Sequence, residues 1–176
     1  MKTITKIGVA IALCTTAVCA GTSIFNGKLS TGFNMGVDTD KKERKWMKVS
    51  QNQIAMSYPV NQEWGTVFIT VGNPSPMGSR RWKDFSNLDT LLVTARGKVG
   101  GEFVLIGMKD NSDPDDGTET KFPITLSKTD STYKFAIKDF ITLDKKMVYI
   151  PCEFVFESSG GSTRPVDVFV KEIMFK

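Results

Sequence analysis

Five carboxylate side chains fall within ten residues in the second half of the chain: Asp110, Asp113, Asp115, Asp116 and Glu119. Carboxylates at this density repel one another unless a cation or solvent intervenes, and oxygen-only ligands suit calcium. Gly117 would allow a sharp turn, although the spacing is not that of an EF-hand, whose glycine is the sixth loop position. The segment is interpreted either as a structural calcium site or as a solvated Asp-Pro/Asp-Gly turn between two strands.

Two tryptophans directly follow basic clusters. Trp46 comes after the charged run 41–45, and Trp82 comes after Arg80-Arg81. An exposed indole ring can stack on the apolar face of a sugar, and arginine pairs with a carboxylate or sulfate through two hydrogen bonds. We therefore predict one surface with both rings beside cations and a preference for acidic polysaccharides. Its cations would be Arg44, Lys45, Arg80 and Arg81.

Other interpretations of these clusters stay open. A charge run is usually a solvated face, and aromatic rings among cations can also hold single-stranded nucleic acid. The formal net charge of +4 is too balanced to indicate nucleic acid, so we expect none. For Trp82, capping the core and contacting a ligand are both open.

The remaining aromatic candidates divide by their strand patterns. Trp64 opens the apolar run Val67, Ile69, Val71, and we predict that it packs in the core. Tyr149 falls on the face of its strand that carries Glu153, so we predict that it lies on a solvent-facing sheet and contacts ligand.

The chain contains no histidine. This excludes Ser-His-Asp and Cys-His nucleophiles and every histidine-containing metal site. A pair of carboxylates is the one common hydrolytic apparatus still available, and it would have to come from residues on or beside strands: Glu102, Asp110, Glu153 and Asp167. Without a recognisable nucleophile motif, we expect no enzyme activity.

The first twenty residues have the three parts of a secretory signal peptide. Lys2 and Lys6 precede an apolar run, which ends in Val18-Cys19-Ala20. The run is too short for a membrane span, so we predict cleavage near Ala20, a secreted or periplasmic location and no transmembrane segment afterwards. Cys152 is then the single cysteine, and its alternating apolar run predicts a buried thiol without a disulfide.

Short runs rich in Val, Ile, Phe, Tyr and Thr, each closed by Gly, Pro, Asn or Asp, indicate strands. We predict them at about residues 45–49, 53–58, 64–71, 90–96, 102–109, 120–126, 132–137, 147–157 and 166–175. Residues 158–162 are predicted as a hairpin tip. Residues 21–45 are predicted as an irregular lead-in or edge segment, and 46–176 as one all-β sandwich that binds a ligand.

From Trp64 onward, the order of motifs resembles a known family. The motifs are Trp64-Gly65-Thr66-Val67, Trp82-Lys83-Asp84-Phe85-Ser86, Leu88-Asp89-Thr90-Leu91, Ala95-Arg96-Gly97, Gly107-Met108-Lys109-Asp110 and the run from Val148 to Glu157. They are similar to galactose-binding-like jelly-roll domains, in particular the carbohydrate-binding modules of secreted bacterial glycoside hydrolases. The resemblance implies an antiparallel jelly roll of about eight to ten strands, often with structural calcium and without catalytic residues.

Together these observations predict a non-catalytic protein that binds a polysaccharide or oligosaccharide. The alternative is a structural or assembly subunit that uses the sandwich surface against another protein or a second copy of the chain. A sugar binder needs exposed aromatic rings among polar groups in a groove, whereas an assembly subunit needs a contiguous apolar patch.

Overall fold

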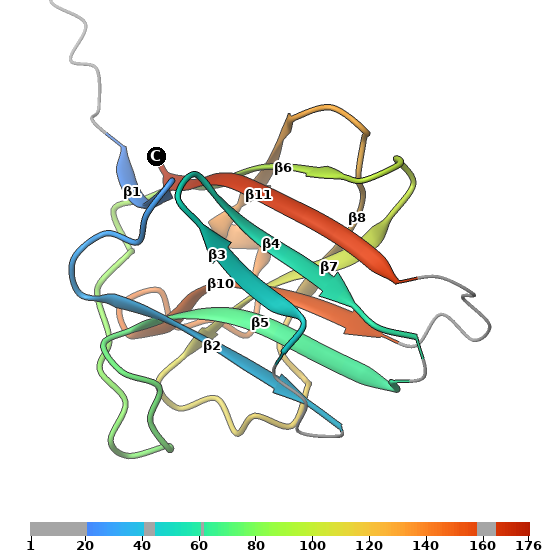
Figure 1. Cartoon of the computed structure of the whole chain (residues 1–176). Helices are drawn as coiled ribbons and strands as arrows, with labels where there is room; N and C mark the ends of the chain where they lie inside the picture. The colour runs from blue at the N-terminus through green and yellow to red at the C-terminus, as the bar shows by residue number, and fades with distance from the viewer. Residues whose placement is uncertain (1–20, 41–44, 61, 158–164) are drawn as a thin grey trace, which may run out of the picture.

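The computed structural model describes residues 21–40, 45–60, 62–157 and 165–176. Two antiparallel sheets pack face to face in these residues, as Figure 1 shows, and the predicted antiparallel β-sandwich is confirmed. The eleven strands are β1 (Thr22–Asn26), β2 (Phe33–Thr39), β3 (Met47–Ser50), β4 (Gln53–Tyr58), β5 (Trp64–Val71), β6 (Thr90–Gly97), β7 (Phe103–Asp110), β8 (Lys121–Thr125), β9 (Ser131–Ala136), β10 (Val148–Glu157) and β11 (Val166–Phe175).

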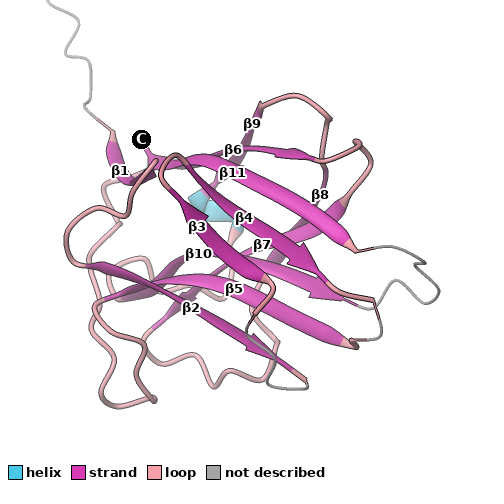
Figure 2. Ribbon diagram, in the orientation of Figure 1, coloured by secondary structure: helices cyan, strands magenta, loops and turns pink. Residues whose placement is uncertain are grey.

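One sheet has the strand order β3-β4-β11-β6-β9, with β1 also paired to β11, and the other has the order β2-β5-β10-β7-β8. A three-residue 3-10 helix, η1 (Ile137–Asp139), stands out in Figure 2 against the strands. It is the one helix in the described part of the chain and is far too short to cross a bilayer.

The segment 21–45 contributes strands to both sheets. Strand β1 pairs with the end of β11, and β2 pairs with β5 along its whole length, where it forms the edge of the five-stranded sheet. Figure 1 shows β1 beside the C-terminal end of the chain. Residues 41–44 lie outside the described residues.

The pairing of strands β10 and β11 shows that the predicted hairpin at residues 158–162 is wrong. Strand β10 pairs with β5 and β7 in one sheet, whereas β11 pairs with β4, β6 and β1 in the other. A hairpin joins two strands that pair with each other, so the connection between β10 and β11 crosses from one sheet to the other instead. Residues 158–164 themselves are not described.

Alternating side chains of both sheets fill the space between the layers. Cys152 is fully buried there and free, which confirms the predicted buried thiol. Burial raises the pKa of this thiol, because the charged thiolate is disfavoured away from water.

Trp46 belongs to the same core, and the expectation that it is partly exposed is wrong. It is 9% exposed and packs edge-on against Tyr58 and Phe156, with ring centroids 5.6 and 5.4 Å away. Gly65 makes room for this cluster, because a Cβ there would lie 3.1 Å from the indole and 2.9 Å from the Tyr58 ring. The polar neighbours of Trp46 in the sequence gave no sign of this space, because Gly65 on strand β5 provides it.

Candidate ligand-binding site

The outer face of the five-stranded sheet carries a row of register partners that runs across all its strands: Gly36, Phe68, Glu153, Gly107 and Lys121. The two glycines let large neighbours lie flat on the sheet. A Cβ at Gly36 would lie 2.4 Å from the Phe68 ring, and a Cβ at Gly107 would lie 2.3 Å from Glu153 Oε1. Both distances are below van der Waals contact, so only glycine fits beneath these side chains.

A hollow of about 420 Å³ opens on this face, beside the acidic loop that follows β7. Strands β5, β7, β8 and β10 form its floor, and the loop forms one wall. Its lining side chains are mostly polar or charged: Trp64, Thr66, Lys109, Asp115, Asp116, Glu119, Lys121, Glu153, Val155 and Glu157, with Gly117.

Lys109 is the centre of the charges on the floor. Its Nζ lies 3.4 Å from Glu119, 3.5 Å from Asp113 and 3.5 Å from Asp115, and the side chain is 9% exposed. Burial disfavours the ammonium charge, but the carboxyl groups of Glu153 and Glu119 outweigh it, so the pKa of Lys109 is raised. Lys109 therefore stays charged and neutralises several carboxylates at once.

The carboxyl groups of Glu119 and Glu153 lie next to each other beside Lys109, and each affects the protonation of the other. Burial, followed by the charge of neighbouring Glu119, raises the pKa of Glu153 to about 8 even though Lys109 opposes the shift. For Glu119, hydrogen bonds from Lys121 and the backbone outweigh burial and lower the pKa. Two neighbouring carboxyl groups cannot both ionise cheaply, so the buried Glu153 favours its protonated form and Glu119 favours its charged form.

Three residues that line this hollow each have a buried oxygen without a hydrogen-bond partner among the described residues: Thr66 Oγ1, Glu119 Oε2 and Glu153 Oε1. Glu119 Oε2 lies near the Lys109 ammonium group. Thr66 Oγ1 and Glu153 Oε1 could accept hydrogen bonds from a ligand. Buried polar atoms without partners are costly in a folded protein, so each one calls for an explanation such as a bound ligand.

Trp64 lies at the rim of this hollow, and the expectation that it packs in the core is wrong. Trp64 is 41% exposed, while Val67, Ile69 and Val71 are buried. The even positions of β5 point outward and the odd positions inward, so Trp64 shares the outer face with Thr66 and Phe68. The alternation of even and odd positions along β5 was the sequence signal that would have predicted the exposure of Trp64.

The carboxylates of the acidic loop are bonded within the protein. In the described residues, no three His, Cys, Asp or Glu side chains gather where they could hold a metal ion. Asp110 accepts hydrogen bonds from Ser112 and from the Asp144 N–H, and Asp116 accepts two from Thr118. Cationic side chains instead pair with the rest of the predicted ligands: Lys109 with Asp113, Asp115 and Glu119, Arg80 with Asp115, and Lys121 with Glu119.

Arg80 and Tyr149 are structural residues, which corrects their expected roles in ligand contact. Arg80 is 7% exposed, pairs with Asp115 and donates to the Asp113 carbonyl oxygen at 2.6 Å. Its guanidinium lies 4.8 Å from the centre of the Tyr149 ring. The Tyr149 hydroxyl accepts a hydrogen bond from the Ser75 N–H at 2.8 Å. The loop after β5 therefore covers this tyrosine and separates it from solvent. Neither side chain is free to bind a sugar.

The predicted surface that combines Trp46 and Trp82 does not form. Trp46 contacts Phe156 near the end of β10, whereas Lys83, next to Trp82, pairs with Val148 at its start. Eight residues of extended strand separate these points by about 26 Å. Trp82 and Arg81 are exposed, but they lie at the opposite end of the sandwich from Trp46 and Lys45. Arg44 lies outside the described residues.

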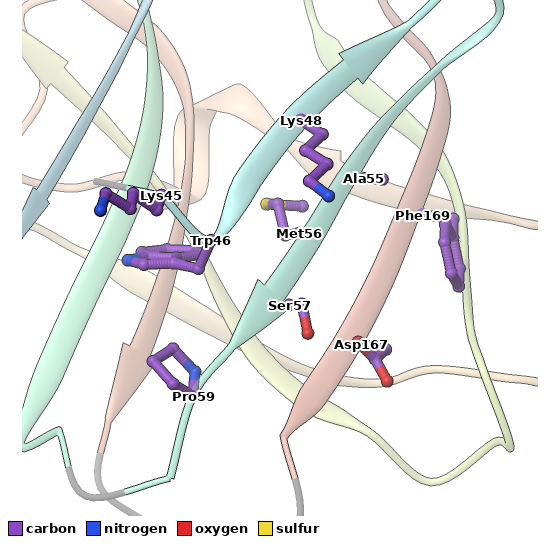
Figure 3. Close-up of a pocket in the computed structure, with 9 residues that line it drawn as sticks. All are labelled: Lys45, Trp46, Lys48, Ala55, Met56, Ser57, Pro59, Asp167 and Phe169. Carbon is purple, nitrogen blue, oxygen red and sulfur yellow. The ribbon is translucent and has the colours of Figure 1, made fainter. Parts of the chain in front are cut away.

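A second hollow, shown in Figure 3, lies on the outer face of the six-stranded sheet over β3, β4 and β11. Lys48, Asp167 and Phe169 line it, and Trp46 lies at its edge. Two of its side chains already have partners: Asp167 pairs with Lys98 at 3.1 Å, and Phe169 lies under the Arg96 guanidinium at 4.2 Å. Its aromatic rings are less available to a ligand than Trp64 is, because Trp46 is buried and Arg96 lies over Phe169.

The four carboxylates considered for hydrolysis do not oppose one another across a cleft. Glu153 lines the hollow on the five-stranded sheet, whereas Asp167 lines the one on the six-stranded sheet. Glu102 accepts a hydrogen bond from the Val99 N–H at 2.8 Å. Asp110 accepts a hydrogen bond from the Ser112 N–H within its own loop. Glu153 interacts instead with Glu119, which is bonded to Lys109 and Lys121.

No protein-family model and no curated protein sequence matches the chain. Solved structures do resemble it. The family 30 carbohydrate-binding module of a cellulosomal cellulase from Clostridium thermocellum has 14% identity and a TM-score of 0.57, over 89% of this chain and 96% of that one. A second family 30 module has 15% identity and a TM-score of 0.56, over 89% and 98%. A family 29 module variant, used to probe ligand recognition, has 16% identity and a TM-score of 0.51, over 89% and 91%.

These likenesses span nearly the whole of each chain at low identity. They confirm the resemblance to carbohydrate-binding jelly rolls at the level of the fold. At this identity, a shared fold by itself carries no ligand from one protein to the other.

Proposed function

We propose that the chain binds carbohydrate, without catalysis, in the hollow beside Trp64. The observation that carries the proposal is an exposed aromatic ring at the rim of a hollow that holds unpartnered polar oxygens of Thr66 and Glu153. The ring offers a face for the C–H side of a sugar, and the oxygens offer hydrogen bonds to its hydroxyl groups. The fold shared with carbohydrate-binding modules supports the same conclusion.

The contact between Glu119 and Glu153 supports the non-catalytic part of the proposal. A retaining or inverting glycosidase must fit the glycosidic bond between its two carboxyl groups. Glu119 and Glu153 instead interact with each other, and Glu119 is bonded to Lys109 and Lys121. The pair instead offers a fixed polar group on the floor of the hollow.

The predicted preference for acidic polysaccharides loses its physical basis. It depended on Trp46, Arg80 and the other cations forming one surface with Trp82, and these residues lie apart or are buried. The hollow beside Trp64 is instead lined by more carboxyl groups than lysines.

A glycan array tests the proposal, followed by calorimetric titration of the glycans that bind. Trp64→Ala is expected to weaken binding at least about tenfold, as loss of a central aromatic contact does. Trp82→Ala is the matched control, because its ring is also exposed, at 50%, but lies outside the hollow. Unchanged binding by the Trp64 variant, or a loss confined to the Trp82 variant, would place the site elsewhere. Far-ultraviolet circular dichroism of both variants checks that they fold.

Export of the protein is proposed from its N-terminal pattern. The charged start, the apolar run and Ala20 support a signal peptide, although these residues lie outside the described part. Mass spectrometry of the exported protein would locate the cleavage.

The assembly role and homo-oligomerisation stay predictions, and the molar mass in solution tests them.

A further inference from the structure

The hollow beside Trp64 has an uneven charge. Five carboxyl side chains and two lysines line it. Both lysines are recessed, with side-chain exposures of 9% for Lys109 and 16% for Lys121, and both are bonded within the protein. Lys121, for example, donates to the Gly117 carbonyl oxygen at 2.7 Å and pairs with Glu119 at 3.0 Å. The cations therefore neutralise the floor and offer little to a ligand above it.

The carboxylates at the mouth are more accessible than the lysines. Asp116 and Glu157 are exposed, and in the described part of the chain neither has a cation within ion-pair distance. Asp38, also exposed, is the register partner of Thr66 on the neighbouring strand β2. A ligand that enters the hollow thus meets a negative rim before it meets the neutralised floor.

Trp64 lies within this negative rim. Glu157 is its direct register partner on β10, so a carboxylate lies beside an exposed indole ring. A cation held by such a carboxylate can also lie over the ring, which attracts positive charge through its π-electron face. An anionic sugar in the same position would be repelled by Glu157.

A second observation, independent of the rim, points to a bound ligand. The side chain of Glu153 is almost completely buried, with the residue 2% exposed, and its Oε1 lacks a hydrogen-bond partner in the described residues. Glu153 is one of the residues that line the hollow. A hydroxyl or amino group of a ligand would supply the missing partner.

From these contacts we propose that the hollow prefers glycans that carry free amino groups, such as oligomers of glucosamine, over neutral and acidic glycans. The inference rests on the proposed carbohydrate binding and adds its charge preference. The ammonium group lies between Glu157 and the Trp64 ring, and the sugar hydroxyls reach Thr66 and Glu153.

Titration calorimetry of the mature protein at mildly acidic pH, where the amine is protonated, tests this preference. The probes are oligomers of equal length made of glucosamine, N-acetylglucosamine, glucose or galacturonic acid. The glucosamine oligomer is expected to bind most tightly, and its advantage is expected to shrink as salt is added. Glu157→Gln should weaken its binding by up to about fivefold, the scale of one exposed ion pair, and leave the glucose oligomer unaffected. Asp139→Asn, an exposed acid on η1, is the matched control and should change neither.

The outcomes separate the charge preference from the binding itself. If a glucose or galacturonate oligomer binds at least as tightly and Trp64→Ala removes that binding, the preference is wrong and the proposed function stands. If no oligomer binds, both are wrong. Binding of the glucosamine oligomer that neither Trp64→Ala nor Glu157→Gln weakens would place the ammonium elsewhere and overturn the inference. Tighter binding of a lysine-rich peptide than of any sugar would overturn it as well.

Discussion

Glu153 of β10 lies over Gly107, its register partner on β7, so closely that a Cβ on the glycine would stand 2.3 Å from the carboxyl oxygen. The missing side chain of one residue is thus the space that the other occupies. The position of the buried carboxyl group on the floor of the hollow depends on this pairing.

Gly107→Ala is therefore expected to destabilise the protein by about 1–3 kcal/mol, as overpacking at a tight site does. The same substitution in a Glu153→Ala background should cost less, because the clashing carboxyl group is then absent. Denaturant unfolding of the four proteins in this cycle measures both costs. Equal costs in the two backgrounds would contradict the contact.

Lys109→Met is expected to lower the free energy of unfolding by about 3–5 kcal/mol, because it leaves buried carboxylates without their cation. Lys121→Met is the matched control. Lys121 pairs with a single carboxylate, Glu119, and is more exposed, so its removal should cost less. Chemical unfolding of both variants checks the order, and a larger loss for Lys121→Met would contradict the central role of Lys109.

Glu153 should make stability depend on pH. The folded state raises the pKa of this carboxyl group from 4.5 to about 8, so the folded protein binds the proton more tightly than the unfolded chain does. The stabilisation from the protonated form is complete below about pH 4.5 and is lost as pH rises through about 8. The Glu153→Gln side chain cannot ionise. As pH rises between these two values, the free energy of unfolding of the variant should therefore increase relative to that of the wild type, by up to about 1.4 kcal/mol per pH unit. A constant difference across that window would contradict the raised pKa.

Calcium is expected to leave the melting temperature unchanged. Lys109, Lys121 and Arg80 supply the positive charge that the acidic loop needs, and Asp110 and Asp116 already accept hydrogen bonds within the loop. Thermal unfolding with calcium and with chelator measures this directly. A higher melting temperature in calcium would show that the folded state binds the ion and would support the predicted calcium site.

Periodicity in the sequence was sufficient to predict the sandwich. Alternating apolar residues identified the nine strands from β3 to β11, because the two faces of each strand meet different environments. In the segment 21–45, β2 lies at a sheet edge and β1 pairs with the end of β11, and glycine and polar residues there weaken the alternation.

The site was harder to predict, because exposure depends on which distant segments cover a face. Tyr149 is covered by the loop that carries Ser75 and Arg80, a contact between residues 74 positions apart. Trp46 is buried because Gly65 leaves space for it. Trp64 was the exception, since its position relative to Val67 already placed it on the outer face.

Strands β10 and β11 occupy the middle of the two sheets, yet they are the last two strands of the chain. Each sheet is therefore two separate groups of strands until residues 148–175 are synthesised and insert between them. Such late, long-range pairing makes folding slow and prevents a nascent chain from closing its core early. A chain that lacks residues 148–175 therefore stays open. Limited proteolysis of ribosome-bound chains that stop before Val148 should find no protected core.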